Sequence, residues 1–171
     1  MLFLKPFRWQ GPLAALLISG SLWGQFHSAG LAAVEPSPLA AFPAELRPLV
    51  QALQRAGYRV MLARPPVDGA YGATNARRRQ VWLAPITIEL GIARQALIHE
   101  AVHAAQGCPK GKLRPIGWSL AMPKPVDREV AGVLYRNYPH AQHDVEREAF
   151  AMQGHPRAVA LITAALQQRC R

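Results

Sequence analysis

The chain has 171 residues, of which 50% are hydrophobic and 18% charged. This composition suits one modest globular domain and excludes a coiled coil or a largely disordered chain. Twenty Lys and Arg residues against ten Asp and Glu give a formal net charge of +10. The basic residues are scattered apart from the run at 77–79, and no aromatic residues interleave them, so we expect no nucleic-acid site.

The N-terminal segment, residues 1–33, has the features of an export signal. Lys5 and Arg8 precede an apolar stretch at 11–23, and small residues follow at 28–33. This order is typical of a secretory signal peptide. A membrane anchor is the second interpretation, because no charged residue occurs between Arg8 and Glu35. Under either interpretation residues 34–171 form the folded domain, which is exported to the periplasm or the extracellular space.

The exported part predicts two strands among several helices. Residues 34–42 are a short linker, and 43–56 have the apolar spacing of a helix that ends at Gly57. Residues 58–63 and 77–84 predict strands, and 71–75 between them resemble a turn, so we expect a hairpin or small sheet. Residues 90–106 are apolar on most sides, which is typical of a helix buried at the centre of a domain.

Beyond this central helix, residues 108–125 predict a proline-containing loop, and helices are expected at 126–135, 140–153 and 156–168. The whole pattern predicts an α+β fold. Cys108 and Cys170 lie in the exported part. An even pair in an oxidising compartment predicts one disulfide, which would tie the last helix to the middle of the fold.

The central helix carries the motif His99-Glu100-x-x-His103. Histidines at i and i+4 lie about 40° apart around a helix and one turn along it, so both imidazoles face the same point. This spacing suits two nitrogen ligands of Zn²⁺, with Glu100 beside them as a general base. The alternative is a pair of core histidines that bond backbone carbonyls, but burying three polar groups without partners would cost several kcal/mol.

The motif resembles the zinc helix of the zincin metallopeptidases. Gln106 and Pro109 stand where one subgroup has Gly and a third His, so that subgroup does not fit. The gluzincin branch instead takes a glutamate from a later helix, in the pattern E-x-x-A that Glu146 and Ala149 match. The resemblance therefore implies a small, minimal zincin-like domain. In it a short β-sheet packs on the central zinc helix, further helices follow, and Glu146 completes the zinc site.

Glu148 is the alternative third ligand. Residues two apart on a helix differ by about 200° in direction, so Glu146 and Glu148 cannot both face the zinc ion. Glu146 shares a mainly apolar stripe with Ala149 and Phe150, whereas Glu148 lies on the side of Asp144. We therefore favour Glu146 and expect Glu148 to face solvent or to support the ligands from behind. Phe150 departs from the family pattern, in which Asp or Asn often orients the glutamate.

The resemblance also implies a mechanism of metal-assisted hydrolysis. Three protein ligands leave the fourth zinc position to water, and Glu100 takes a proton from that water as it attacks a carbonyl. A strand ahead of the zinc helix aligns a peptide or protein substrate, a role that falls here to residues 77–84. An electrophilic helper is expected among four residues, between which spacing does not choose: Tyr135, Tyr138, His140 and His143.

Two other functions stay open. The first is an exported, non-catalytic module that keeps zinc for stability or for binding a partner. The second is a basic protein associated with an anionic membrane surface, in which the histidine motif is incidental. Hydrolysis that disappears in Glu100→Gln while zinc stays bound would distinguish the enzyme from both.

Overall fold

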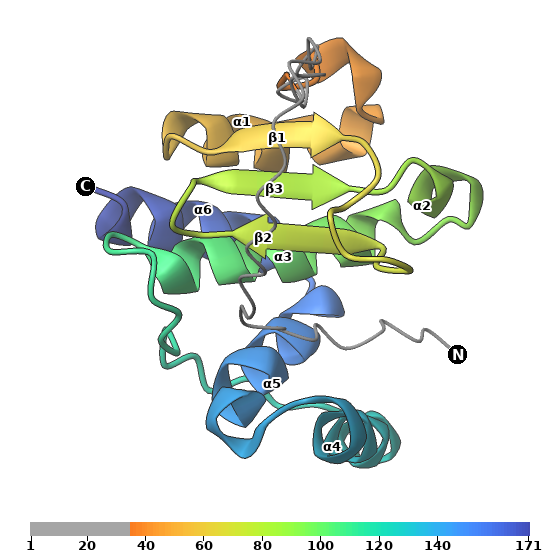
Figure 1. The fold of residues 1–171 in the computed structure, drawn as a ribbon. Helices are drawn as coiled ribbons and strands as arrows, with labels where there is room; N and C mark the ends of the chain where they lie inside the picture. The colour runs from red at the N-terminus through yellow and green to blue at the C-terminus, as the bar shows by residue number, and fades with distance from the viewer. Residues whose placement is uncertain (1–34) are drawn as a thin grey trace, which may run out of the picture.

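The computed structural model describes residues 35–171, and the predicted signal peptide or anchor lies outside them. The described chain is an α+β fold, as predicted (Figure 1). Its helices and strands follow in the order α1 (Arg47–Arg55), β1 (Arg59–Leu62), β2 (Gly72–Asn75), β3 (Gln80–Leu83), α2 (Ile86–Glu89), α3 (Ala93–Gly107), α4 (Lys124–Asn137), α5 (His143–Gln153) and α6 (Ala158–Arg169). Short 3-10 turns precede α1, at Leu39–Ala41 and Ala44–Leu46, and another at His140–Gln142 precedes α5.

The sheet has the strand order β1-β3-β2, with β1 parallel and β2 antiparallel to β3. The prediction of a turn at 71–75 was wrong, because these residues include β2, which pairs with β3 from Gly72 opposite Leu83 to Asn75 opposite Gln80. Gly, Ala and Asn are poor strand formers, and Thr74 is the only β-branched residue of β2, so the segment lacks the alternation that marks a strand in a sequence. Pairing with β3 and packing against α3 hold it in place.

Helix α3 is the centre of the fold. Every residue from Ala96 to Gly107 is buried, because the helix contacts β2, β3, α5 and α6. In Figure 1 the helices α1, α3 and α6 lie behind the sheet, and α5 and α4 lie below α3. The predicted central buried helix is therefore confirmed, and it presents its polar residues to neighbours on several sides.

The predicted disulfide is present between Cys108 and Cys170, at an S–S distance of 2.07 Å. It joins the C-terminal end of α3 to the C-terminal end of α6. Within residues 35–171, none of the helices is both long enough and apolar enough to cross a bilayer.

Candidate metal centre

Three buried side chains bring one possible ligand atom each to a common point. His99 and His103 project from adjacent turns of α3, with their Nε2 atoms 3.1 Å apart. Oε2 of Glu146, from α5, lies 3.3 Å from Nε2 of His99 and 3.4 Å from Nε2 of His103. The three residues are between 4% and 8% exposed. The two helices thus bring together the set that the sequence predicted.

The geometry of this triangle fits a metal ion. Ligands at the 2.0–2.2 Å bond lengths of tetrahedral zinc lie about 3.4 Å from one another, close to the three separations found here. Oε2 of Glu146 is also buried without a hydrogen-bond partner. A buried carboxylate oxygen without a donor is costly, and a cation between the three atoms would satisfy it. His99, His103 and Glu146 could therefore hold a metal ion.

The electrostatics of the site also favour positive charge. Burial by itself would raise the pKa of Glu146, but electrostatic attraction from His103 and His99 holds that pKa well below its usual range. Burial would likewise lower the pKa of His103, yet the Glu146 carboxylate, helped by Glu100, raises it to about 9. The carboxylates thus draw either a proton or a metal cation to the imidazoles.

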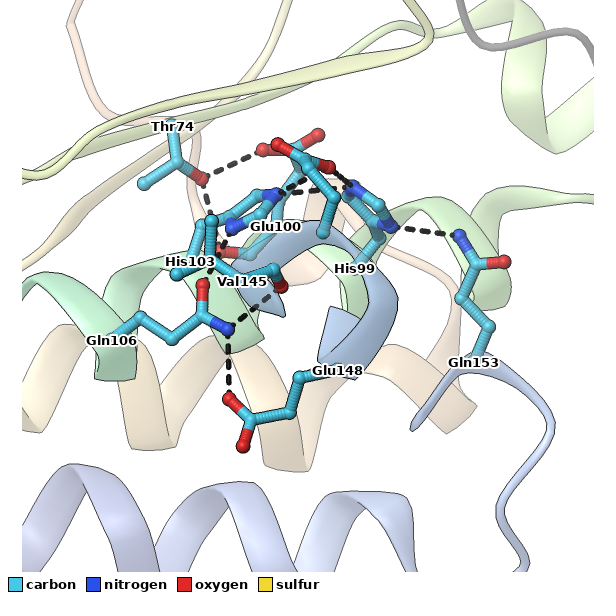
Figure 2. A network of polar contacts seen from close by, with 9 residues as sticks. Thr74, His99, Glu100, His103, Gln106, Val145, Glu148 and Gln153 are labelled. Atoms are coloured by element: carbon cyan, nitrogen blue, oxygen red, sulfur yellow. Dashed lines mark hydrogen bonds and ion pairs between the residues drawn. The ribbon is translucent and has the colours of Figure 1, made fainter. Parts of the chain in front are cut away.

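Two glutamines hold the histidine rings from the other side. Nδ1 of His103 lies 2.8 Å from Oε1 of Gln106, which fixes the proton on Nδ1 and leaves Nε2 free. Nδ1 of His99 lies 3.1 Å from the carboxamide nitrogen of Gln153. A half-turn of that amide presents its oxygen to a protonated Nδ1. Each ring therefore has an orienting partner, although no carboxylate serves in this role (Figure 2).

Glu148 is buried and does not face the candidate metal site. Of the two expectations for it, exposure to solvent was wrong, and the structure places it behind the candidate ligands, where it bonds Gln106. Its Oε2 accepts hydrogen bonds from Nε2 of Gln106 and from the amide of Ile116, each at 2.8 Å. Its Oε1 accepts from the amides of Gly117, at 2.7 Å, and Trp118, at 3.0 Å. The loop after α3 folds over this face of α5, which a helical projection cannot reveal. Glu148 instead supports Gln106, and through it His103, as seen in Figure 2.

Glu100 lies beside the triangle and turns toward β2. Its Oε2 is 2.8 Å from Oγ1 of Thr74, which also lies 2.9 Å from the backbone oxygen of Glu100. A Cβ at Gly72 would come within 2.6 Å of Cγ of Glu100, so only glycine leaves room for this carboxylate against the strand. Thr74 and Gly72 were missed by sequence reasoning because β2 itself was missed.

A cavity of about 380 Å³ opens beside the candidate ligands. Glu100, both histidines and Glu146 contribute to its wall, together with β2 and the segment that leads into α5. Most of the remaining wall is small or apolar: Val67, Ala70, Ala73, Leu113, Ala141 and Val145. The cavity thus gives a small apolar group access to the ligand atoms and to Glu100 at the same time.

Of the four helper candidates, only Tyr138 lines this cavity. Burial, with the nearby charges of Glu146 and Glu100, raises the pKa of its hydroxyl far above the usual value. Tyr135 is 85% exposed, and His140 is exposed against the ring of His143. His143 itself is bound through Nε2 to the backbone oxygen of Tyr138, at 3.0 Å.

The strand beside the cavity is β2 and not the segment 77–84 that the sequence indicated. The latter forms β3, which lies between β1 and β2 and has no free edge. The amide of Ala84 donates to the oxygen of Tyr71, so this opposed pair is hydrogen-bonded. Because bonded and non-bonded pairs alternate, the amides and carbonyls of Gly72 and Thr74 point to the open edge of β2. Neither residue has a backbone hydrogen bond on that side within residues 35–171.

Phe150, the residue that departs from the family pattern, packs its ring edge-on against His99, with ring centroids 4.9 Å apart. Comparison with known proteins adds nothing to this description, since no family model, curated protein or solved structure matches the chain.

Proposed function

We propose that this protein is an exported zinc-dependent metallohydrolase that cleaves peptide bonds. The observation that carries the proposal is the buried triangle of His99, His103 and Glu146, whose carboxylate oxygen has no hydrogen-bond donor and which opens on a cavity. A zinc ion bound there would lower the pKa of a water molecule and polarise a substrate carbonyl. All other steps of the reaction fall to side chains of the chain itself.

The number of ligands favours a catalytic site over a structural one. Structural zinc sites are closed by four protein ligands, whereas catalytic sites have three and keep one position open. Within residues 35–171 the cluster contains three candidate ligands, and it borders a cavity and not the packed core. A module that keeps zinc only for stability would have no use for that opening. Zinc is favoured because the two histidines stand at i and i+4 on one helix with Glu100 beside them, which is the arrangement of hydrolytic zinc sites.

Glu100 is suited to transfer the proton. Thr74 occupies Oε2 of the carboxylate, which leaves Oε1 to accept a proton from the attacking water. Glu100 then passes this proton to the leaving nitrogen as the carbon–nitrogen bond breaks. Tyr138 serves as a donor to the carbonyl oxygen, since its raised pKa keeps the hydroxyl protonated at neutral pH.

A peptide substrate is supported by the open edge of β2. An extended peptide can pair with the outward amides and carbonyls of Gly72 and Thr74 as an added strand. Those two residues adjoin Glu100, so the pairing would bring a peptide bond next to the proposed base. Export is supported by the disulfide, because such bonds persist in oxidising compartments.

Metal analysis combined with hydrolysis of fluorescently labelled casein tests this proposal. The wild-type protein should retain zinc after dialysis and release labelled fragments. Glu100→Gln should keep its zinc and lose hydrolysis by about a hundredfold or more. Glu89→Gln, a matched change at an exposed glutamate, should leave both unchanged. Zinc binding with no hydrolysis by the wild type would favour the non-catalytic module.

A further inference from the structure

A cluster of exposed basic side chains borders one end of the cavity. We call it the basic rim. It comes from two segments, the turn between β2 and β3 and the loop that follows α3. Its members are Arg77, Arg78, Lys110, Lys112 and Arg114, each exposed. In Figure 1 this turn and the start of this loop lie at the same end of the sheet.

Two glycines bring the rim segments into direct contact. A Cβ at Gly111 would lie 2.8 Å from Cα of Arg77, and one at Gly107 would lie 2.3 Å from Cβ of Ala76. Gly111 also has a φ of +74°, which other residues rarely adopt. The backbones of the turn and the loop are therefore in contact. This contact places the backbone of Lys110 and Lys112 close to that of Arg77.

The rim has no internal counter-charge. The sequence contains no Asp or Glu between Asp68 and Glu89, and none between Glu100 and Asp127. Across residues 35–171, no rim side chain takes part in a salt bridge or a side-chain hydrogen bond. Neighbouring Arg79 behaves differently, since its guanidinium is tied to the backbone oxygen of Ala56 at 2.7 Å. Like charges held together without partners repel one another, which favours binding of an anionic group.

The rim is continuous with the wall of the cavity. Leu113, between Lys112 and Arg114, lines the cavity, and so does Thr74, three residues before Arg77. A peptide paired with the open edge of β2 would pass from Glu100 over Thr74 toward the rim. An extended chain advances about 3.3 Å per residue. Its side chains would thus reach the rim about two to four residues from the bond at Glu100.

We infer that the basic rim selects peptide substrates with acidic side chains on one side of the cleaved bond, an inference that rests on the proposed peptidase function. A membrane surface is less suited to the rim. Three exposed apolar side chains, Ile86, Ile88 and Leu90, belong to α2 or directly follow it. This helix lies at the opposite end of the sheet in Figure 1. Of the large exposed apolar side chains in residues 35–171, Leu113 alone lies within the rim segments, and one side chain buries too little apolar surface to anchor the rim in lipid.

Binding measured without cleavage tests the inference separately from hydrolysis. The Glu100→Gln protein is titrated into a fluorescein-labelled alanine-based peptide with glutamates near one end, and into its twin with glutamines. Fluorescence anisotropy should give about tenfold tighter binding of the glutamate peptide at low salt, and the difference should shrink as salt is added. Because no turnover is required, a protein without hydrolytic activity can still pass this test.

Two triple variants separate the rim from the general basic charge. Arg77→Gln/Arg78→Gln/Lys112→Gln should bind both peptides equally. Arg94→Gln/Arg128→Gln/Arg157→Gln removes the same charge from exposed positions outside the rim and should still prefer glutamate. If the Glu100→Gln protein without further changes binds the two peptides equally, or binds neither of them, the inference is overturned. A rim variant that keeps its preference and instead loses binding to phosphatidylglycerol vesicles would also overturn it.

Discussion

The two faces of helix α5 each bury a carboxylate, and the atoms around the two are of opposite kinds. Glu148 accepts hydrogen bonds from Gln106 and from the loop amides of Ile116, Gly117 and Trp118. Glu146 meets two imidazole nitrogens, and its Oε2 has no hydrogen-bond partner. A carboxylate surrounded by donors is satisfied by the fold, whereas one without donors needs a cation. Similar burial thus conceals two different roles.

The largest effect should follow from changing the carboxylate without donors. Glu146→Gln removes a negative charge and a ligand atom from the triangle, so zinc affinity should fall by more than the 10- to 100-fold loss typical of changes behind the ligands. Competition with a chromophoric chelator measures this affinity. The protein should remain folded by circular dichroism, because Oε2 makes no hydrogen bond that the fold depends on. Unchanged zinc affinity would remove Glu146 from the site.

Glu148→Gln should have the converse result. The new amide group would point its own N–H donor at Gln106 or at the loop amides, which are donors too. One buried group would then be unpaired, which should lower the free energy of unfolding by about 1–3 kcal/mol. Urea denaturation measures this loss. Zinc affinity should fall by about 10- to 100-fold, because Gln106 would no longer be held against His103. A larger loss of zinc here than in Glu146→Gln would reverse the two roles.

The strand side of the site can be tested separately from the ligands. Gly72→Ala places a methyl group within 2.6 Å of Cγ of Glu100 and forces that carboxylate to move. Zinc should stay bound, while hydrolysis of labelled casein should fall by about tenfold or more. Gly132→Ala is the control, because it makes the same change on α4, outside the cavity wall, where the new methyl group would meet only the flexible end of Arg136 at 3.3 Å. Full activity in Gly72→Ala would show that the Glu100 position is not critical.

The smallest effect concerns pH in the metal-free protein. The pKa of His103 is raised to about 9 in the folded state, so its contribution to stability is fully present below the unfolded value near 6.5. That contribution is lost as the pH rises to about 9. The pKa of Glu146 is lowered, so its contribution is lost only as the pH falls below the usual carboxyl range. Chemical denaturation of the metal-free protein should therefore show stability falling between pH 6.5 and 9, and Glu146→Gln should make this slope shallower, because Glu146 contributes most to the raised pKa.

The candidate ligands could be predicted from the sequence by two different routes. The i, i+4 spacing of His99 and His103 places both rings on one face of any helix, whereas Glu146 was found through the resemblance of Glu146 and Ala149 to the E-x-x-A pattern. The residues around the candidate ligands lie on segments whose sequence has neither helical nor strand periodicity. Strand β2 consists of Gly-Ala-Thr-Asn and is held by its partner strand, and the loop that covers Glu148 binds through backbone amides, which any residue type could supply. Neither the support of Glu100 nor the burial of Glu148 was therefore predictable.

X-ray absorption spectroscopy of the zinc-loaded protein tests the central claim most directly, since it measures the ligands of the ion itself. We predict only nitrogen and oxygen neighbours at about 2.0–2.2 Å, with the outer-ring scattering of two imidazoles from His99 and His103. Glu146→Gln should alter this spectrum, and Glu148→Gln should leave the ligand set unchanged. A sulfur neighbour at about 2.3 Å, or a spectrum without imidazole scattering, would contradict the assignment.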